Sequence, residues 1–426
     1  MLDPTPARTE ATSYPKPAKI LSRSNLYLAW KSSRDATSNP GRPGIDGLTA
    51  ERFGARIEEQ ISALSSELRT GTYRPYRLRP VFIPKPDSSK ERLICIPAVR
   101  DRVVQKAIVS YLVTTEKFPI ENEFSFGFVR GRGTLHAIER ALELRNRYAW
   151  CLKTDIEAFF DRISRSDAKL RVSKSLKNSS LTPLVHQFID CEIKSNITTR
   201  SKLLKQGIVA GRGLRQGMPL SPILANLVLS EFDAAFRRER IDMVRYADDL
   251  LVFFNSKRAA REGFEFIKAQ LGAQGLTIPE LGDESSKTQI VASEQPVSFL
   301  GLQLAYSGSR GGYVKKVGRK LIAKIRARLE NEFNFDTLRK QKVNFQQANT
   351  ELSIAISSCL SAYRGTDDFM ILNSELRHTA RKVLEGIYED VFGVGVLDNV
   401  SLAGREFLGL GSLALPAENS DPVGAD

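Results

Sequence analysis

The pattern of hydrophobic and polar positions predicts a chain that alternates between helical and extended stretches. Apolar residues recur at helical spacing in residues 25–34, 54–69 and 103–118. Residues 73–86 alternate apolar and basic side chains, as a half-exposed strand does, and residues 149–160 begin as an apolar strand that ends on an acid. The first part of the chain is therefore expected to combine helices with strands.

The middle of the chain contains a long helix and two predicted hairpins. Residues 216–240 are a loop that enters a helix, with Pro222 at a first-turn position. The stretch RYADDLLVFF, residues 245–254, has two strands joined by Asp248 and Asp249. Residues 299–314 form a second predicted hairpin that turns at SGSRGG.

From Lys315 onward the pattern is helical. An apolar stripe along this region is expected from Val317, Leu321, Ile325 and Leu329. Basic residues cover the other faces: Lys316, Arg319, Lys320, Lys324, Arg326 and Arg328. The two ends have a different composition. Residues 1–19 are proline-rich and polar and predict a flexible arm, and residues 416–426 are polar and acidic and predict a disordered tail.

Composition indicates a nucleic-acid partner. The chain has 426 residues, of which 42% are hydrophobic, enough for two or three subdomains with a large core. A net charge of +14 favours a polyanionic partner, either nucleic acid or an acidic membrane. No apolar run approaches the roughly 18 residues that span a bilayer, and no signal-peptide pattern is seen, so nucleic acid is the better candidate and no membrane is expected.

Cysteine and histidine usage argues against a zinc site. The four cysteines have no paired metal-ligand spacing, and the chain has three histidines. Unpaired cysteines fit a reduced, cytoplasmic setting. The cysteines are Cys95, Cys151, Cys191 and Cys359.

The adjacent carboxylates Asp248 and Asp249 interrupt a pattern that otherwise predicts a buried strand. Two carboxylates about 4 Å apart repel by roughly 4 kcal/mol at an effective dielectric near 20. A solvated turn, a pair of structural ion pairs and a cation site each explain their presence, and a turn is the usual explanation for Asp-Asp. If the strand before Asp155 lies beside this hairpin, three carboxylates meet at one sheet end, where divalent cations such as Mg²⁺ would neutralise them.

Six blocks of the sequence resemble the ordered blocks of reverse transcriptases. In chain order they are VFIPKPDSSKERLICIP, SFGFVRGRGTLHAIERAL, LKTDIEAFFD, GLRQGMPLSPILANLVLSEFD, YADD with its apolar continuation, and FLGLQL. They span roughly residues 20–305 together with the N-terminal region. A lone YADD is weak evidence, whereas six blocks in order are strong evidence.

The resemblance implies an α+β right-hand polymerase fold with fingers, palm and helical thumb. The implied divisions are residues 20–148 for the N-terminal extension and fingers, 149–310 for the palm with a fingers insertion near 165–205, and 315–415 for the thumb and C-terminal region. It implies RNA-directed DNA synthesis from dNTPs on an RNA template, with a DNA primer or product. It also implies two Mg²⁺ ions, with Mn²⁺ as a substitute.

Catalytic roles carry over from the matched motifs residue by residue. Asp155 and Asp248 resemble the two metal-binding carboxylates, Asp249 the third acid, and Ile156 the residue whose backbone carbonyl completes one metal site. Phe160 resembles the aromatic gate that stacks under the sugar and excludes a 2′-hydroxyl. The alternative for the phenylalanine pair is two core aromatics, which is expected to hold for Phe159.

Substrate-binding roles carry over in the same way. The alternatives are an idle surface charge for Lys85 and Arg92, a core position for Phe299 and Leu300, and an ordinary solvated helix face for the basic residues after Lys315. Nucleotide binding is implied for Lys85, Arg92, Gln216, Gly217 and Lys287. A grip on the primer terminus is implied for Phe299, Leu300 and Gly301. Contacts with the nucleic-acid backbone are implied for Lys316, Arg319, Lys320 and Lys324.

The sequence indicates the subgroup of reverse transcriptases less specifically than it indicates the family. The N-terminal region resembles enzymes of the group II intron lineage, but GLRQGMPLSPILAN and FGFVRGRGT depart from that pattern. The divergent C-terminal region, residues 330–415, resembles domesticated, defence-associated bacterial enzymes, which implies a structured non-coding RNA template and a role against phage. A group II intron-encoded enzyme with maturase function, other mobile or CRISPR-linked forms, and a non-catalytic RNA-binding scaffold are the alternatives.

Overall fold

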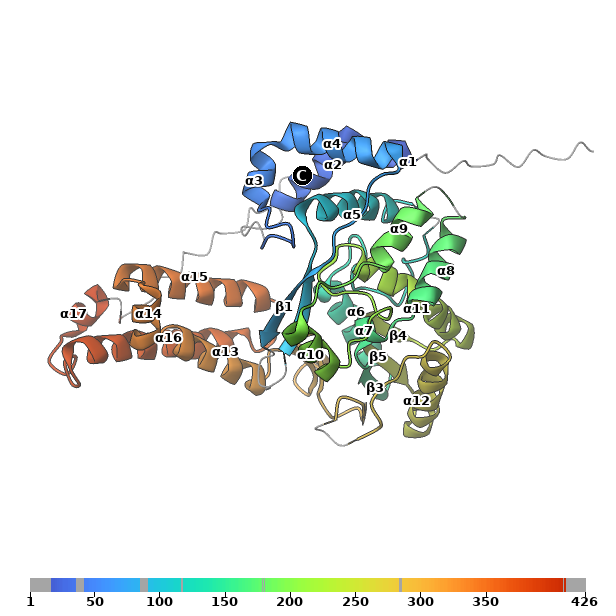
Figure 1. The fold of residues 1–426 in the computed structure, drawn as a ribbon. Helices are drawn as coiled ribbons and strands as arrows, with labels where there is room; N and C mark the ends of the chain where they lie inside the picture. Colours follow the sequence, from blue (N-terminus) through green and yellow to red (C-terminus); the bar gives the residue numbers. More distant parts are fainter. Residues whose placement is uncertain are drawn as a thin grey trace, which may run out of the picture. The chain divides into compact units, whose positions relative to one another are not determined.

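The computed structural model describes residues 17–35, 42–84, 91–115, 118–177, 179, 181–282, 286–408 and 410. The chain divides into two compact units (Figure 1). Unit 1 joins Met1–Ala141 to Tyr148–Ile290, and unit 2 joins Leu142–Arg147 to Val291–Asp426. Residues 1–16 of the predicted arm and the predicted tail, 416–426, lie outside the described residues, whereas residues 17–19, also predicted to belong to the flexible arm, lie in helix α1 (Pro17–Ile20).

A four-stranded sheet forms the centre of unit 1. Its strands lie in the order β4 (Met243–Tyr246), β5 (Asp249–Phe254), β3 (Trp150–Asp155), β6 (Gln289–Val291). β5 pairs antiparallel with both β3 and β4. All its residues after Asp249 are buried, which explains why this strand has a continuous apolar run rather than an alternating one. The predicted hairpin at RYADDLLVFF is thus confirmed.

Helices cover this sheet and extend the core. α12 (Lys257–Gly272) packs against β3 and β5 (Figure 1). α11 (Ser221–Glu239) has Pro222 in its first turn, as predicted, and ends where Arg240 adopts a left-handed conformation at φ 54°. α8 (Arg165–Ser175) packs against α11 and against α9 (Thr182–Ile189).

The remaining elements of unit 1 include the predicted extended segment near residue 80. β1 (Arg79–Pro84) and β2 (Glu91–Ile96) form a two-stranded antiparallel sheet. Three helices, α2 (Arg23–Asp35), α4 (Ile57–Thr70) and α5 (Val99–Leu112), confirm the helical stretches predicted in the first part of the chain, and α2 packs against the other two. The other helices of unit 1 are α1 (Pro17–Ile20), α3 (Ala50–Ala55), α7 (Phe159–Arg162), α10 (Ile197–Lys205) and the part of α6 (Thr134–Arg147) up to Ala141.

Unit 2 contains a three-stranded sheet and a helical region. The sheet has the order β7 (Val297–Phe299), β8 (Leu302–Ser307), β9 (Gly312–Lys316), so the second predicted hairpin is confirmed. The helices are α13 (Arg319–Glu332), α14 (Phe335–Gln341), α15 (Phe345–Tyr363), α16 (Phe369–Phe392) and α17 (Leu402–Phe407). α13, α14 and α15 all pack against α16.

The prediction that the chain is helical from Lys315 is wrong. Lys315 and Lys316 belong to β9, where they pair with Leu304 and Gln303 of β8. Gly318, at φ 77°, ends the extended segment, and the carboxylate of Asp368 accepts hydrogen bonds from the Val317 and Gly318 amides. The buried stripe of α13 therefore differs from the predicted one. It consists of Ile322, Ile325 and Leu329, whereas Leu321 is half-buried.

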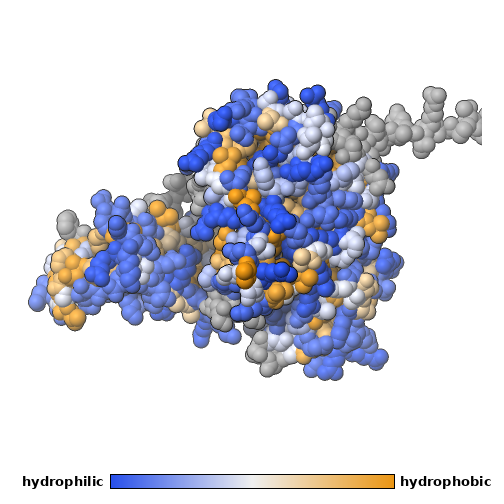
Figure 2. Space-filling view, viewed as in Figure 1, coloured by the Kyte–Doolittle hydropathy of each residue, from blue (hydrophilic) through white to orange (hydrophobic). Residues whose placement is uncertain are grey.

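The visible face of the molecule is mostly hydrophilic, with smaller apolar patches between the polar residues (Figure 2). Among the described helices, none combines the length and the apolar character that a membrane crossing requires.

Candidate active site

The hairpin between β4 and β5 separates the two adjacent aspartates. Ala247 and Asp248 form the turn, and Ala247 adopts a left-handed conformation with φ 56°. Asp249 is already the first residue of β5. The Asp pair is therefore not a solvated two-residue turn, because only Asp248 lies at the tip.

The register between β3 and β5 brings the third carboxylate, that of Asp155, close to Asp248 and Asp249. Asp155, the last residue of β3, lies directly opposite Asp249 on β5. Side chains of directly opposed residues lie on the same face of a sheet, with Cβ atoms about 5 Å apart. The amide of Ile156 donates a hydrogen bond to the carbonyl oxygen of Asp248 (3.1 Å), which ties the end of β3 to the turn. The prediction that the strand ending at Asp155 lies beside the Asp248–Asp249 hairpin is confirmed.

The environment of Asp248 and Asp249 disfavours their negative charge in the absence of a cation. Burial, and then the charge of Asp155, raises the pKa of Asp248. Burial and the adjacent charge of Asp248 raise the pKa of Asp249 to about 6. Burial lowers the pKa of the nearby Lys153, with Asp249 and Asp155 opposing that shift. Lys287 Nζ forms an ion pair with Asp155 Oδ2.

The donor set fits a hard divalent cation. Among the residues that the structure describes, no three His, Cys, Asp or Glu side chains are gathered closely enough to hold a metal ion. The second oxygen of Asp155, Oδ1, is nevertheless buried and has no hydrogen-bond partner. A buried carboxylate oxygen without a donor is costly, and oxygen-only ligands suit Mg²⁺. Asp155 and Asp248 are thus suited to hold Mg²⁺ in company with substrate oxygens.

An open pocket of about 720 Å³ collects most of the predicted residues of unit 1. Asp249 and Gly217 do not line it. Those that do come from β2, the end of β3, α7, the loop before α11, the turn between β4 and β5 and the segment before β6: Arg92, Asp155, Ile156, Phe160, Gln216, Asp248 and Lys287.

The two phenylalanines of α7 have different surroundings. Phe159 is 2% exposed and belongs to the core, as predicted, and Phe160 is half-buried; both line the pocket. Their ring centroids are 5.4 Å apart. The carbonyl of Phe160 accepts a hydrogen bond from the Leu214 amide (2.7 Å), which joins α7 to the loop that carries Gln216.

The loop before α11 is in backbone contact with β2. The Gln216 carbonyl accepts a hydrogen bond from the Cys95 amide (2.7 Å). At Gly217, with φ 103°, an added Cβ would lie 2.5 Å from the Cys95 carbonyl oxygen. The glycine at position 217 therefore allows a close approach of this loop to the backbone of β2.

Sequence reasoning missed the contribution of α10 to the pocket. Lys202, Lys205 and Gln206 line it, and Lys202 forms an ion pair with Glu91 (3.1 Å). Two lysines at i, i+3 in ITTRSKLLKQ were the available signal, but they fall between the recognised blocks.

The other predicted residues lie elsewhere. Lys85 falls outside the described residues. In unit 2, Phe299 is the buried last residue of β7, and Leu300 and Gly301 form the turn to β8 with φ 48° and 85°. Lys316 ends β9, and Arg319, Lys320 and Lys324 are exposed on the first two turns of α13.

Comparison with known proteins identifies a family match and distant relatives. Residues 83–304 match the family described as "Reverse transcriptase (RNA-dependent DNA polymerase)". Protein YkfC of Escherichia coli is 32% identical over 203 residues, covering 45% of this chain and 49% of that protein. The group II intron-encoded protein LtrA of Lactococcus lactis is 24% identical over 366 residues, covering 71% of this chain and 58% of that protein. The chain thus spans about half to three-fifths of the length of these relatives.

A solved structure of apo telomerase from Candida tropicalis is also similar. It has 13% sequence identity and a TM-score of 0.43, with 85% of this chain and 71% of that chain covered.

Proposed function

The chain belongs to the reverse transcriptase family, and from this premise we propose that it is an RNA-directed DNA polymerase whose active site is the pocket at the end of β3. The observation that carries the proposal is the pairing of Asp155 with Asp249, with Asp248 bound through its carbonyl to Ile156. The reaction is attack of a primer 3′-hydroxyl on the α-phosphorus of a dNTP, with pyrophosphate as the leaving group.

In this proposal the carboxylates hold the catalytic cations. Asp155 and Asp248, with the carbonyl of Ile156, would hold two Mg²⁺ ions, and Asp249 would support them from the neighbouring strand position. When bound, Mg²⁺ or Mn²⁺ activates the attacking hydroxyl and neutralises charge on the phosphates.

The remaining pocket residues bind and orient the nucleotide. Arg92, with Lys85, neutralises the triphosphate, and Lys287 lies ready to contact the leaving group. Gln216 contacts the sugar and base, and Phe160 lies beneath the sugar, where its ring leaves no room for a 2′-hydroxyl. Lys202 and Lys205 of α10 add positive charge at the same pocket.

For the biological role we propose copying of a dedicated, structured non-coding RNA in bacterial antiphage defence. The divergent helical C-terminal region, α14 to α17, and the departures from intron-type motifs support this role. The second candidate is a group II intron-encoded enzyme, which the similarity to LtrA over 71% of this chain favours.

The decisive test of the polymerase is extension of a DNA primer on an RNA template by wild type and by Asp155→Ala and Asp248→Ala. Both variants are expected to lose extension and to keep the duplex affinity of the wild type. The melting temperature of Asp248→Ala is expected to equal or exceed that of the wild type, because burial raises the pKa of that carboxyl and makes its charge unfavourable in the folded protein. Asp190→Ala is the matched control, since Asp190 pairs with Lys169 outside the pocket. Wild-type-like synthesis by Asp248→Ala would contradict the proposal, and a wild type that binds RNA without any synthesis would favour the non-catalytic scaffold.

The role is tested by sequencing RNA and DNA that co-purify with wild type and with Asp248→Ala. One abundant structured RNA, with complementary DNA in the wild type alone, supports the dedicated template. Intron RNA in both preparations supports the intron-encoded alternative.

A further inference from the structure

A buried arginine lies directly beneath the turn that Ala247 and Asp248 form between β4 and β5. Arg245, on β4, has no exposed surface. Its Nε and Nη2 donate to the two carboxylate oxygens of Asp233 on α11, at 2.8 and 2.5 Å. Its Nη1 donates to the side-chain oxygen of Asn226 (2.9 Å) and to the carbonyl oxygen of Ala247 (3.2 Å).

Because Asp233 neutralises the Arg245 guanidinium through Nε and Nη2, the third nitrogen, Nη1, is available to bind neutral acceptors. A buried unpaired guanidinium is strongly unfavourable, but Asp233, itself 1% exposed, neutralises it through a two-bond contact. Nη1 is left to bind two neutral acceptors. One of these, the Ala247 carbonyl, belongs to the residue that precedes Asp248 and has a left-handed backbone.

A second segment of the chain packs against the same turn. Asn226 Nδ2 donates to the Gly127 carbonyl (2.8 Å), and the Phe126 amide donates to the Arg245 carbonyl (2.9 Å). At Gly127 an added Cβ would lie 2.6 Å from the Ala247 amide nitrogen, so the two backbones are in direct contact. Asn122 Nδ2 also binds Asp233 (2.8 Å). The turn is thus held by α11, by residues 122–127 and by β5.

We propose that Arg245 is a positioning residue for polymerisation: by holding the Ala247 carbonyl, it fixes the left-handed turn that directs the Asp248 carboxylate into the pocket. Asn226 orients the guanidinium for this contact, and Asp233 neutralises it. The inference rests on the proposed polymerase function. Groups that orient a metal ligand typically influence metal affinity or activity by about 10- to 100-fold.

The test compares Arg245→Lys and Asn226→Ala with wild type. Lysine keeps the charge opposite Asp233 but has a single nitrogen, which cannot also bind Asn226 and Ala247. Alanine removes one acceptor of Nη1 and is a good helix former, so α11 is preserved. Measurements are kcat and KM for dNTP on a primer–RNA template, duplex affinity, and melting temperature.

A readout independent of turnover is Mn²⁺ binding. Electron paramagnetic resonance measures the Mn²⁺ concentration at half-saturation in complexes with dNTP and a primer that lacks its 3′-hydroxyl. Arg245→Lys is expected to lower kcat by about 10²-fold and to weaken Mn²⁺ binding by about 10-fold, with KM and duplex affinity nearly unchanged. Asn226→Ala is expected to show the same pattern with a smaller loss.

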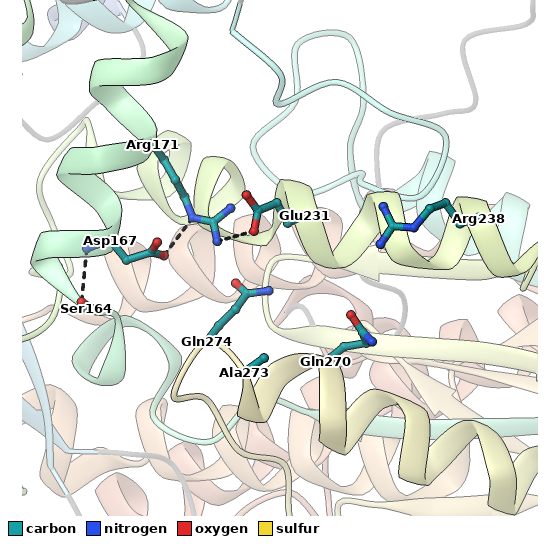
Figure 3. A pocket seen from close by; sticks show the side chains of 8 residues that line it. All are labelled: Ser164, Asp167, Arg171, Glu231, Arg238, Gln270, Ala273 and Gln274. Atoms are coloured by element: carbon teal, nitrogen blue, oxygen red, sulfur yellow. Dashed lines mark hydrogen bonds and ion pairs between the residues drawn. The ribbon is translucent and has the colours of Figure 1, made fainter.

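The matched control is Arg171→Lys. Arg171 is also a buried arginine, and it binds Asp167 (2.8 Å) and Glu231 (2.9 Å). Glu231 lies on α11, two residues from Asp233, in a separate polar pocket of about 740 Å³ lined by residues of α8, α11 and α12 (Figure 3). None of the catalytic carboxylates lines that pocket. The control therefore perturbs the same helix without touching the turn, and its kcat is expected to equal that of wild type.

Two outcomes would overturn the proposal. One is an unchanged kcat and Mn²⁺ affinity in folded Arg245→Lys. The other is a loss of kcat in Arg171→Lys that matches the loss in Arg245→Lys, because both would then reflect stability alone. If Arg245→Lys does not fold, Asn226→Ala decides, and wild-type kcat in that variant would count against the role. Absence of synthesis by the wild type would instead refute the polymerase proposal itself.

Discussion

Asp248 and Asp249 are adjacent in the chain, but the hairpin gives them different surroundings. Asp248 lies at the turn and lines the pocket, while Asp249 lies in β5 opposite Asp155 and near Lys153. Burial raises the pKa of both carboxyls. Without a cation, the folded protein therefore pays a free-energy cost to ionise them.

Asp249→Asn is predicted to stabilise the metal-free protein above pH 6. The folded-state pKa of Asp249 is raised from 3.8 to about 6, so the folded state binds the proton more tightly than the unfolded state between these values. Wild-type stability therefore falls as pH rises through this window, and the asparagine variant lacks this loss. Urea unfolding in EDTA should show a gain of about 1–2 kcal/mol at pH 7, after allowance for solvent screening, and almost none near pH 4. An equal gain in stability at both pH values would contradict a raised pKa of Asp249 in the folded protein.

Phe160→Val is predicted to admit ribonucleotides. Removal of the ring opens space beneath the sugar, so the preference for dNTP over rNTP, measured as the ratio of kcat/KM values, should fall by about 10- to 100-fold. Phe264→Leu is the control, because Phe264 is a phenylalanine of the core with 2% exposure that does not line the pocket, so its loss should lower stability without changing sugar selectivity. Unchanged selectivity in Phe160→Val would assign the gate to another residue.

At the scale of elements, the pocket depends on backbone contacts between segments that are distant in sequence. The Gly213 and Leu214 amides donate to the carbonyls of Ile163 and Phe160, and the Cys95 amide donates to the Gln216 carbonyl. β2, α7 and the loop before α11 therefore form a connected frame around the pocket. A change in one of these segments is transmitted to the others through hydrogen bonds whose geometry tolerates little displacement.

Gly217→Ala is predicted to disturb this frame. The new Cβ would meet the Cys95 carbonyl at 2.5 Å, and the backbone φ of 103° is unfavourable for alanine. The free energy of unfolding should fall by about 2–3 kcal/mol, and KM for dNTP should rise because Gln216 moves. Gly275→Ala is the control: its φ is 70° and no atom lies within 4 Å of the new Cβ, so only the backbone cost of about 1 kcal/mol is expected. Equal losses in the two variants would show that the contact with β2 is not tight.

At the scale of the whole molecule, the net charge of +14 is relevant to a polyanionic substrate. Unit 1 contains the pocket, and unit 2 contains the basic first turns of α13. Binding through lysine and arginine releases counterions from nucleic acid, which makes affinity depend on salt rather than on base sequence.

Replacement of Arg319 and Lys320 by alanine is predicted to weaken duplex binding and its salt dependence. Both side chains are exposed on α13. The slope of log affinity against log salt concentration should fall by about 1 to 2. Arg328→Ala is the control, since this arginine already pairs with Glu332 (2.9 Å) and should have a smaller effect. An unchanged slope in the double variant would make this face of α13 an ordinary solvated surface.

Much of the fold and of the candidate site could be predicted from the sequence, because both depend on local pattern. Periodicity placed the strand that ends on Asp155, the hairpin around Asp248 and the helix after Pro222. The order of the motif blocks indicated the family. The prediction failed at Lys315 and Lys316, where basic residues with helical spacing continue a strand because β8 offers them backbone partners.

By itself, then, the sequence determined the types of the candidate catalytic residues, their order and most of the elements that carry them, since side-chain periodicity records which face of each element is buried. The tertiary structure alone decided which residues meet: Asp155 opposite Asp249, Lys202 at the pocket, and Arg245 between Asp233 and the Ala247 carbonyl. The physical reason is that register and buried polar pairing are properties of contacts between distant segments. Their energies depend on burial and geometry that no local pattern contains.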